Sequence, residues 1–307
     1  MSLSLRLLTA AALMLGLLWP AARAAEPAAK ISTDRRDWNA PQKPLRIYGD
    51  TWYVGPHGLS SILLDTGHGL ALFDGDLPES APVIEANIRT LGFRVRDIRW
   101  ILNSHAHVDH AGGIAALQRD SGAQVLASAD GARELALGGA DRSDPQYGDI
   151  PDYPPVSRVR VVRDGEVVRL GNVAVTAHYT PGHTPGSTSW TWTSCVGARC
   201  LRMAYADSLT PISAPGFRFS DDPRRVAAFR RAIATVAALP CDILLTPHPG
   251  ASDFWQRVAR RTSAADAAPL IDTGACRDYA AAATRKLDAR LAQEHAEKAA
   301  HRAGGKP

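Results

Sequence analysis

Three histidines and an aspartate lie within six residues of this sequence, in the segment H-A-H-V-D-H at 105–110. The segment follows the short apolar run IRWIL at 98–102, which is typical of a buried strand. On an extended chain His105 and His107 face the same side, whereas on a helix they would diverge by about 200°. The spacing therefore places both imidazoles together at the end of a buried strand, and it excludes the helical H-E-x-x-H arrangement.

Asp109 and His110 complete a donor set that suits zinc. They follow the strand where a turn can bring both side chains back to the same opening, and Ala111-Gly112-Gly113 leaves room for a close turn and a helix start. Imidazole nitrogens and carboxylate oxygens are ligands that zinc binds in proteins. Only 10 of the 307 residues are histidine, so chance clustering explains the segment poorly. The alternative interpretation is a polar strand end with solvated histidines.

Two further histidines stand in loops that proline and glycine make rigid. His183 lies in T-P-G-H-T-P-G-S, 78 residues after His105, and His248 lies in T-P-H-P-G directly after the run DILL. Each alone is typical of an ordinary loop histidine, but a catalytic zinc site needs ligands from separate segments and an open position. We therefore add both to the candidate ligands. The other histidines lack such a setting: His57, His68, His178, His295 and His301.

Strands and helices alternate in two halves, after a linker of Ala, Pro and polar residues at roughly 25–44. In the first half the pattern predicts short strands within 45–55, 59–66, 69–75, 98–102 and 124–128, and helices over 78–93, 113–122 and 130–139. In the second half it predicts strands within 158–170, 173–180, 187–194, 202–206 and 242–248, and helices over 222–239 and 277–297. This order fits one α/β unit in which two sheets are covered by helices.

The N-terminus has the pattern of a secretory signal peptide. Arg6 precedes an apolar run of 13 residues from Leu7 to Trp19, and Ala22-Arg23-Ala24 is a cleavage site of the A-x-A kind. A bilayer span would need about 20 apolar residues. We therefore expect a signal peptide at 1–24, a mature domain at 25–307 in the periplasm, and no membrane association after cleavage. Cleavage removes two arginines and no acid, so the net charge falls from +4 to +2.

Four cysteines in an exported chain favour disulfides, and three pairings are possible. We favour Cys195–Cys200, which flank the turn-like V-G-A-R, and Cys241–Cys276, which would join a strand start to the last helix. The second bridge would contribute about 3–4 kcal/mol in the chain-entropy model. A zinc site on these cysteines is the alternative, although no C-x-x-C spacing occurs.

Composition narrows the possible partners. Apolar residues make up 45% and charged residues 21%, which is ordinary for a globular protein and excludes extensive disorder. A net charge of +4 with scattered Lys and Arg gives no support to nucleic-acid binding. The oligomeric state cannot be read from the sequence.

The motifs together resemble the metallo-β-lactamase superfamily. HAHVDH, TPGHTPGS and TPHPG carry the superfamily resemblance, and the strings NSHAHVDHAGG, AYADSL, SAPGF and LPCDILLTPHPGASDFW make the chain similar to subclass B3, over roughly 38–300. The resemblance implies a four-layer αβ/βα sandwich of two αβ halves, with a site for two Zn²⁺ between them. It also fits the Cys241–Cys276 bridge.

The resemblance further implies which residues hold each ion and what they do. One zinc is expected on His105, His107 and His183, and the other on Asp109, His110 and His248. Asp109 is the expected catalytic residue, because it can also orient the attacking water or accept its proton. The expected reaction is hydrolysis of the amide of β-lactams (penicillins, cephalosporins and carbapenems), whose carboxylate the short hydroxyls of Ser208 and Ser213 would meet.

Asp207 keeps alternative activities open. In glyoxalase II-like relatives an aspartate in this region bridges both metals, and such an arrangement would make the protein a thioesterase or a lactonase. If Asp207 and Ser208 end a strand, only one of them points to the metals, and the neighbouring motifs favour Ser208. A non-catalytic zinc-binding protein is a further alternative. Trp38 and residues 147–155 are weaker candidates for the walls of the cleft.

Overall fold

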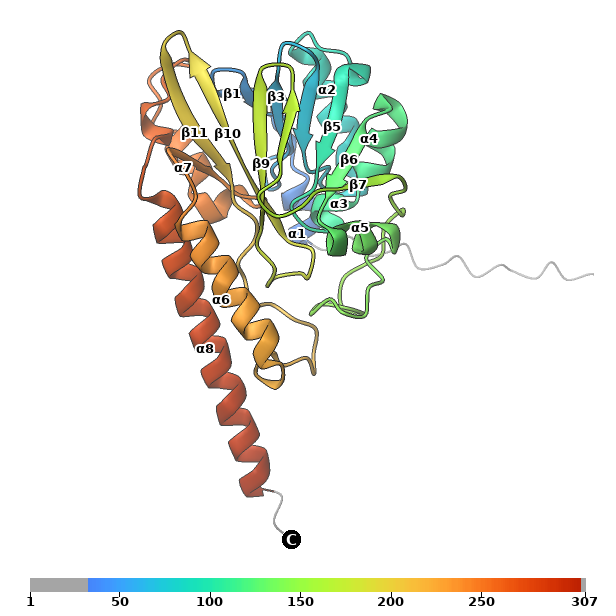
Figure 1. Ribbon diagram of the computed structural model, residues 1–307, viewed down its shortest axis with the longest axis vertical. Helices are drawn as coiled ribbons and strands as arrows, with labels where there is room; N and C mark the ends of the chain where they lie inside the picture. The colour runs from blue at the N-terminus through green and yellow to red at the C-terminus, as the bar shows by residue number, and fades with distance from the viewer. Residues whose placement is uncertain (1–32, 305–307) are drawn as a thin grey trace, which may run out of the picture. The chain divides into compact units, whose positions relative to one another are not determined.

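Two sheets form the centre of the protein, shown here by a computed structural model that describes residues 33–304 (Figure 1). The larger sheet has its strands in sequential order: β1 (Leu45–Tyr48), β2 (Thr51–Tyr53), β3 (Ile62–Asp65), β4 (Leu70–Phe73), β5 (Ile98–Leu102), β6 (Gln124–Ala127) and β7 (Val159–Val161). The other sheet has the order β12 (Ile243–Leu245), β11 (Arg199–Tyr205), β10 (Thr188–Val196), β9 (Val173–Tyr179) and β8 (Val167–Leu170).

Chain direction in the sheets decides where the strand ends lie. Strands β4 to β7 are parallel to one another. In the other sheet β9, β11 and β12 share one direction, because β10 is antiparallel to both of its neighbours and β11 pairs in parallel with β12. The loops after β9, β11 and β12 therefore leave the same edge of that sheet.

Helices cover the outer face of each sheet (Figure 1). On one side these are α2 (Ala81–Thr90), α3 (Val108–Ala111), α4 (Ile114–Ser121) and α5 (Ala129–Ala136), and on the other α6 (Pro223–Ala237) and α8 (Ala275–Gly304). The other elements of the described residues are two short helices, α1 (Thr33–Trp38) and α7 (Phe254–Val258). They also include the 3₁₀ turns η1 (Pro78–Ser80), η2 (Val95–Asp97), η3 (Phe219–Asp221), η4 (Pro249–Ser252) and η5 (Ala268–Leu270).

Three apolar cores separate these four layers. The middle core joins the facing sheets through side chains such as Phe73 and Trp190. Strand β5 shows how alternation supplies two cores, because Trp100 and Leu102 face the other sheet while Ile101 faces the helices. The third core lies beneath α6 and α8. The predicted αβ/βα sandwich is therefore confirmed.

Two expectations about helices need correction. Helix α1 occupies part of the segment that we expected to be a linker, because contacts from distant residues stabilise it: Arg35 forms a bidentate ion pair with Glu79, and Trp38 packs on the core beneath α2. Helix α8 runs to Gly304, beyond the predicted end at 297. Beyond residue 297 the helix lacks the apolar spacing on which our prediction relied, and its Lys298 contacts Asp221 at 3.0 Å.

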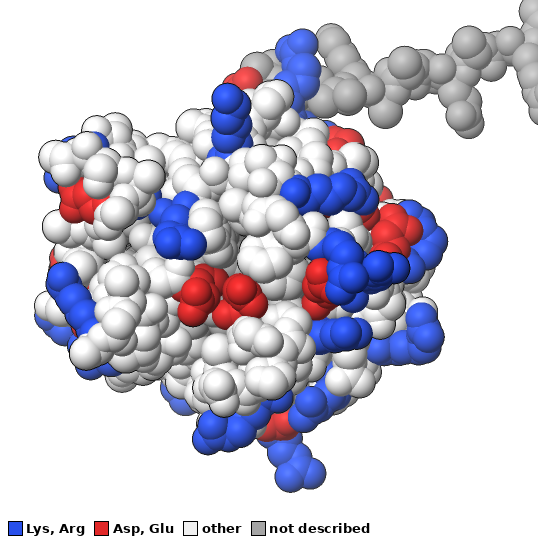
Figure 2. All heavy atoms as spheres, turned by 90° about the horizontal axis from the view of Figure 1, so that it is seen from above, with Lys and Arg blue, Asp and Glu red and all other residues white. Residues whose placement is uncertain are grey.

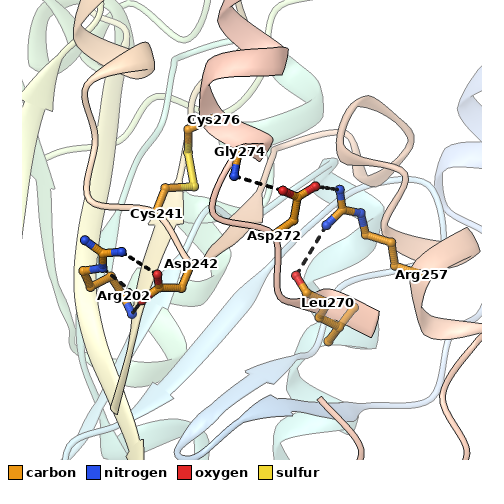
Figure 3. The surroundings of a disulfide bond; sticks show 8 residues. All are labelled: Arg202, Cys241, Asp242, Arg257, Leu270, Asp272, Gly274 and Cys276. Atoms are coloured by element: carbon orange, nitrogen blue, oxygen red, sulfur yellow. Dashed lines mark hydrogen bonds and ion pairs between the residues drawn. A yellow bond between two sulfur atoms is a disulfide. The ribbon is translucent and has the colours of Figure 1, made fainter. Parts of the chain in front are cut away.

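Both favoured disulfides are present in the structure. Cys195–Cys200 links β10 to β11 across a register pair, and Cys241–Cys276 links the start of β12 to the first turn of α8. Figure 3 shows the second bridge beside Asp272, which accepts hydrogen bonds from the Gly274 amide and from Arg257. The bridge thus stabilises the start of α8 together with the turn before it.

The N-terminal predictions lie largely outside the described residues. The expected signal peptide at 1–24 belongs to the part that the structure does not describe. From residue 33 onward, none of the helices is both long enough and apolar enough to span a bilayer.

Candidate metal centre

The candidate ligands all follow strand ends. His105, His107, Asp109 and His110 come after β5, His183 lies in the loop after β9, and His248 follows β12. Because these strand ends meet where the two sheets face each other, side chains up to 143 residues apart in the chain converge. The structure brings all six together.

Glycine allows the close turn after the histidine motif. A Cβ on Gly113 would lie 2.2 Å from the Gly75 carbonyl oxygen, and one on Gly112 would lie 2.4 Å from the Pro78 ring. The chain between Asp109 and α4 therefore packs directly on the turn after β4, as the two glycines predicted. This contact keeps the motif at the edge of the sheet.

His105, His107 and His183 form one cluster of buried imidazoles. One donor atom from each lies within 4.8 Å of the others. His105 Nε2 is buried and has no hydrogen-bond partner among the described residues. A buried imidazole nitrogen without a partner is unfavourable unless a ligand completes it, so this atom fits a metal ion.

The other ring nitrogen of each of these histidines is held by the protein. His105 Nδ1 lies 2.7 Å from Asp207 Oδ1, His107 Nε2 lies 2.9 Å from Asp144 Oδ2, and His183 Nδ1 lies 2.8 Å from the Thr210 carbonyl oxygen. Such acceptors fix the tautomer, because the nitrogen that donates to them carries the proton. The lone pair of the opposite nitrogen is then directed away from these acceptors; His105 Nε2 has no partner among the described residues, whereas His107 Nδ1 lies 3.4 Å from Gln146 Nε2.

Asp109, His110 and His248 form a tighter triangle beside this cluster. Asp109 Oδ2 lies 3.3 Å from both His110 Nε2 and His248 Nε2, and the two nitrogens are 3.2 Å apart. Tetrahedral ligands at the usual zinc distances of 2.0–2.1 Å would be separated by about 3.3 Å. The three atoms therefore already have the mutual spacing of ligands around one zinc ion.

Burial favours the neutral form, which zinc requires, at three of the candidate histidines. It lowers the pKa of His110, and it lowers the pKa of His105 and His183 well below the usual value, with further lowering from neighbouring histidines. For Asp109 burial acts in the opposite direction, but His110 and His248 outweigh it and hold its pKa well below the usual range. Neutral imidazoles and an ionised carboxylate are the forms that bind zinc.

Asp207 lies behind His105, and the expectation that Ser208 rather than Asp207 points to the metals stays a prediction. Its carboxylate is buried and contacts His105 from behind, on the ring nitrogen remote from the unpartnered Nε2. The expectation assumed strand alternation, but β11 ends at Tyr205, so residues 206–210 are irregular and alternation does not apply. Ser208 is also buried, and its hydroxyl has no hydrogen bond to a described residue.

Ser213 is placed differently from our expectation. Its hydroxyl accepts a hydrogen bond from Arg290 of α8 at 2.7 Å and donates to the Phe217 carbonyl oxygen at 3.3 Å. These contacts use the hydroxyl within the loop, so the geometry gives no support to a role in substrate binding. The nearer hydroxyl is that of Thr210, which lies 3.1 Å from His183 Nδ1.

Sequence reasoning missed Asp144, Thr210 and the contact of Asp207 with His105. Asp144 is 37 residues from His107 and lies in a loop without regular structure. Its only signal is an aspartate followed by proline in a turn-rich segment, which is common in loops. Of the weaker candidates for cleft walls, Trp38 does approach the site, with its ring centroid 5.5 Å from that of His248.

A buried hydrogen-bond network around Asp74 lies next to the candidate metal centre. Asp74, in the left-handed region at φ 59°, accepts hydrogen bonds from Asn103, from the amide and hydroxyl of Ser104, and from Tyr205. Tyr205 also donates to the Ser60 carbonyl oxygen. The network joins β11 to the segment just before His105, so it links the two halves at the metal centre.

Comparisons with known proteins agree with this geometry. Residues 48–197 match the family model described as the metallo-beta-lactamase superfamily. The solved structure of MEM-A1, a subclass B3 metallo-beta-lactamase from a soil metagenome library, is 51% identical, covers 85% of this chain and 100% of its own, and has a TM-score of 0.82. MIM-1 from Novosphingobium pentaromativorans, a metallo-beta-lactamase, is 47% identical over 86% of this chain and 94% of its own, with a TM-score of 0.81.

Curated relatives show a more distant similarity. A hydroxyacylglutathione hydrolase of Anaeromyxobacter dehalogenans is 34% identical over 188 residues, which are 61% of this chain and 59% of the relative. A probable metallo-hydrolase of Burkholderia pseudomallei is 28% identical over 48% of this chain and 52% of its own length. The chain thus spans little more than half the length of these curated relatives.

Proposed function

This chain belongs to the metallo-β-lactamase superfamily, and we propose that it is a zinc-dependent β-lactamase that hydrolyses the amide bond of β-lactam antibiotics. The observation that carries the proposal is the pair of adjacent donor sets, one of three histidines and one of Asp109, His110 and His248. The similarity of the chain to a subclass B3 metallo-beta-lactamase at 51% identity, and to the metallo-beta-lactamase MIM-1 at 47% identity, supports the substrate class.

The donor sets fit two zinc ions. His105, His107 and His183 would hold one ion, and Asp109, His110 and His248 the other. Zinc at such sites acts as a Lewis acid and lowers the pKa of bound water to about 7. The unpartnered His105 Nε2 and the triangle spacing are the features of this chain that favour metal at both positions.

Asp109 has the central role among the protein groups. Its Oδ2 faces the two histidine nitrogens, which leaves Oδ1 to orient the attacking water and to accept its proton. Asp207, Asp144 and the Thr210 carbonyl hold the three imidazoles in one tautomer during this step. Ser208 is the remaining candidate for the substrate carboxylate, because its hydroxyl is uncommitted.

Hydrolysis of a carbapenem by the purified mature protein tests the proposal. We expect loss of the β-lactam absorbance, its abolition by a metal chelator, and its recovery on adding zinc. Metal analysis of the same sample should give two zinc ions per chain. Zinc-loaded protein without turnover of any penicillin, cephalosporin or carbapenem would overturn the assignment.

A glyoxalase II-like thioesterase or lactonase is the second candidate. The similarity to hydroxyacylglutathione hydrolases favours it. The position of Asp207 argues against it, because its Oδ1 contacts Nδ1 of His105, on the side of the ring remote from the unpartnered Nε2. A thioester and a lactone assayed beside the carbapenem separate these activities, and zinc binding without any turnover would indicate a non-catalytic zinc protein.

We also propose export through a signal peptide at 1–24 to the periplasm, and a mature domain over 25–307. The two disulfides support an oxidising compartment. N-terminal sequencing of the protein recovered from the periplasm should begin at Ala25.

A small molecule remains the proposed partner. On the face shown in Figure 2, lysines and arginines stand in separate groups among acidic and uncharged residues. This pattern differs from the continuous basic stripe that is typical of nucleic-acid binding. We expect the protein to elute from a size-exclusion column at the same volume with and without DNA, whatever the salt concentration.

A further inference from the structure

The loop at 141–149 is tethered by four different parts of the fold. Asp141 accepts a hydrogen bond from Arg133 of α5, and Asp144 contacts His107 of the metal centre. The Pro145 carbonyl oxygen accepts from the Ala214 amide, which belongs to the loop after β11. The fourth tether comes from α6, in the other half of the molecule. The loop therefore contacts both halves of the molecule and, through Asp144, the candidate metal ligand His107.

Arg225 provides this fourth tether. Its Nη2 donates to the Ser143 carbonyl oxygen at 3.0 Å, and its guanidinium lies 5.5 Å from the centre of the Phe217 ring. The side chain is only 20% exposed, and Nε is buried without a hydrogen bond to a described residue, 3.8 Å from Asp222 Oδ2. Burial of a charged group with an unpaired donor is unfavourable for stability by itself.

We propose that Arg225 is a positioning residue for the three-histidine site, acting through Ser143 and Asp144 on His107. The proposal rests on the proposed zinc function. Ser143 precedes Asp144 in the chain, so a fixed Ser143 carbonyl limits where the Asp144 carboxylate can lie. Asp144 in turn sets the ring direction of His107. A buried arginine with an unpaired donor is unfavourable for stability, and such a local cost near a candidate metal ligand is typical of a functional site.

Arg225→Met, Arg225→Lys and Arg224→Met test this inference. Methionine keeps the length and apolar stem but has no donor, whereas lysine keeps a charged donor that can reach one carbonyl oxygen. Arg224 is the matched control, because it lies next to Arg225 on α6 and is exposed. The His248→Ala background leaves the three-histidine site to be titrated with zinc against a competing chelator.

We expect Arg225→Met to weaken zinc binding at the three-histidine site by about tenfold. Removing an acceptor that contacts a metal ligand directly costs about 10–100-fold in affinity, and Arg225 acts one step further away, so we take the lower end of this range. Arg225→Lys should recover most of this loss, and Arg224→Met should bind zinc like the parent. Amide hydrogen exchange at 143–147 in the zinc-free protein should be faster in Arg225→Met only.

Unchanged zinc affinity in Arg225→Met would overturn the proposal. It would also be overturned if the weaker zinc binding of Arg225→Met came with faster amide exchange throughout the protein, because this would show general destabilisation. Zinc affinity and hydrogen exchange do not depend on turnover. A failure of carbapenem hydrolysis in the parent protein would therefore count against the proposed function, and a normal titration of Arg225→Met would count against the role of Arg225.

Discussion

Asp207 Oδ1 lies 2.7 Å from Nδ1 of His105, and this contact links the loop after β11 to the histidine motif after β5. The two residues belong to different sheets and are 102 positions apart. The contact leaves Nε2 of His105, which is buried and has no partner among the described residues, as the nitrogen available to a metal ion. A carboxylate behind a histidine ligand raises the basicity of the ring and fixes its orientation.

Removing this contact should weaken zinc binding at the three-histidine site. For Asp207→Ala we expect a loss of about 10–100-fold in zinc affinity, and for Asp207→Asn a smaller loss, because the amide oxygen can still accept from Nδ1. Competition with a chromophoric chelator measures both. Asp120→Ala, at an exposed position on α4, serves as the control. Equal affinity in Asp207→Ala and the parent would contradict the role of Asp207.

His248→Ala should remove one zinc ion and most of the activity. The substitution deletes one corner of the triangle with Asp109 and His110, so two donors remain for that ion. We expect zinc content to fall from two to one per chain and kcat/KM to fall by more than about 100-fold. His295→Ala, exposed on α8, should change neither quantity. Normal zinc content in His248→Ala would disprove the assignment of this ligand.

The two candidate serines should behave differently. Ser213→Ala removes the hydrogen bonds to Arg290 and Phe217, so we expect the free energy of unfolding to fall by about 1 kcal/mol while KM for a carbapenem stays within about twofold. Ser208→Ala should instead raise KM, because its hydroxyl is free for the substrate. Urea unfolding and steady-state kinetics measure the two effects. A higher KM in Ser213→Ala alone would reverse the assignment.

The two disulfides should contribute unequally to stability. The chain-entropy model gives about 4 kcal/mol for Cys241–Cys276, with a sequence separation of 35, and about 2 kcal/mol for Cys195–Cys200, with a separation of 5. Paired alanine variants of each bridge, compared by urea unfolding under oxidising conditions, measure the difference. A larger loss for the shorter loop would show that native-state contacts outweigh chain entropy here.

Asp74 should make stability depend on pH. Burial raises its pKa to about 7, above the value near 3.9 of an unfolded chain. Between about pH 4 and 7 the unfolded chain has lost this proton while the folded protein keeps it, so rising pH favours unfolding. We expect the free energy of unfolding of the zinc-free parent, relative to Asp74→Asn, to fall by about 1 kcal/mol per pH unit in this range and to level off above pH 7. A constant difference from pH 4 to 8 would contradict the raised pKa.

Local patterns in the sequence were sufficient to predict the layers and the donor residues. Apolar alternation and helical spacing depend on near neighbours, so β5 and α6 were predicted close to their observed bounds. The H-A-H-V-D-H spacing identified a metal motif from residue chemistry alone. Helix α1 was not predicted, because it is stabilised by the contact of Arg35 with Glu79 and by the packing of Trp38 on the core beneath α2, rather than by its own six residues.

Tertiary structure alone decided what surrounds the donors. Asp207, Asp144 and Thr210 reach their histidines across 102, 37 and 27 residues, and such contacts depend on how two sheets and their loops pack. The same packing directs Ser213 to Arg290 and Arg225 to Ser143. The sequence by itself determined which side chains can bind zinc, because that is a property of each residue and its spacing. Only the fold determined which nitrogen of His105, His107 and His183 is directed away from its acceptor, because that acceptor is supplied from elsewhere in the chain.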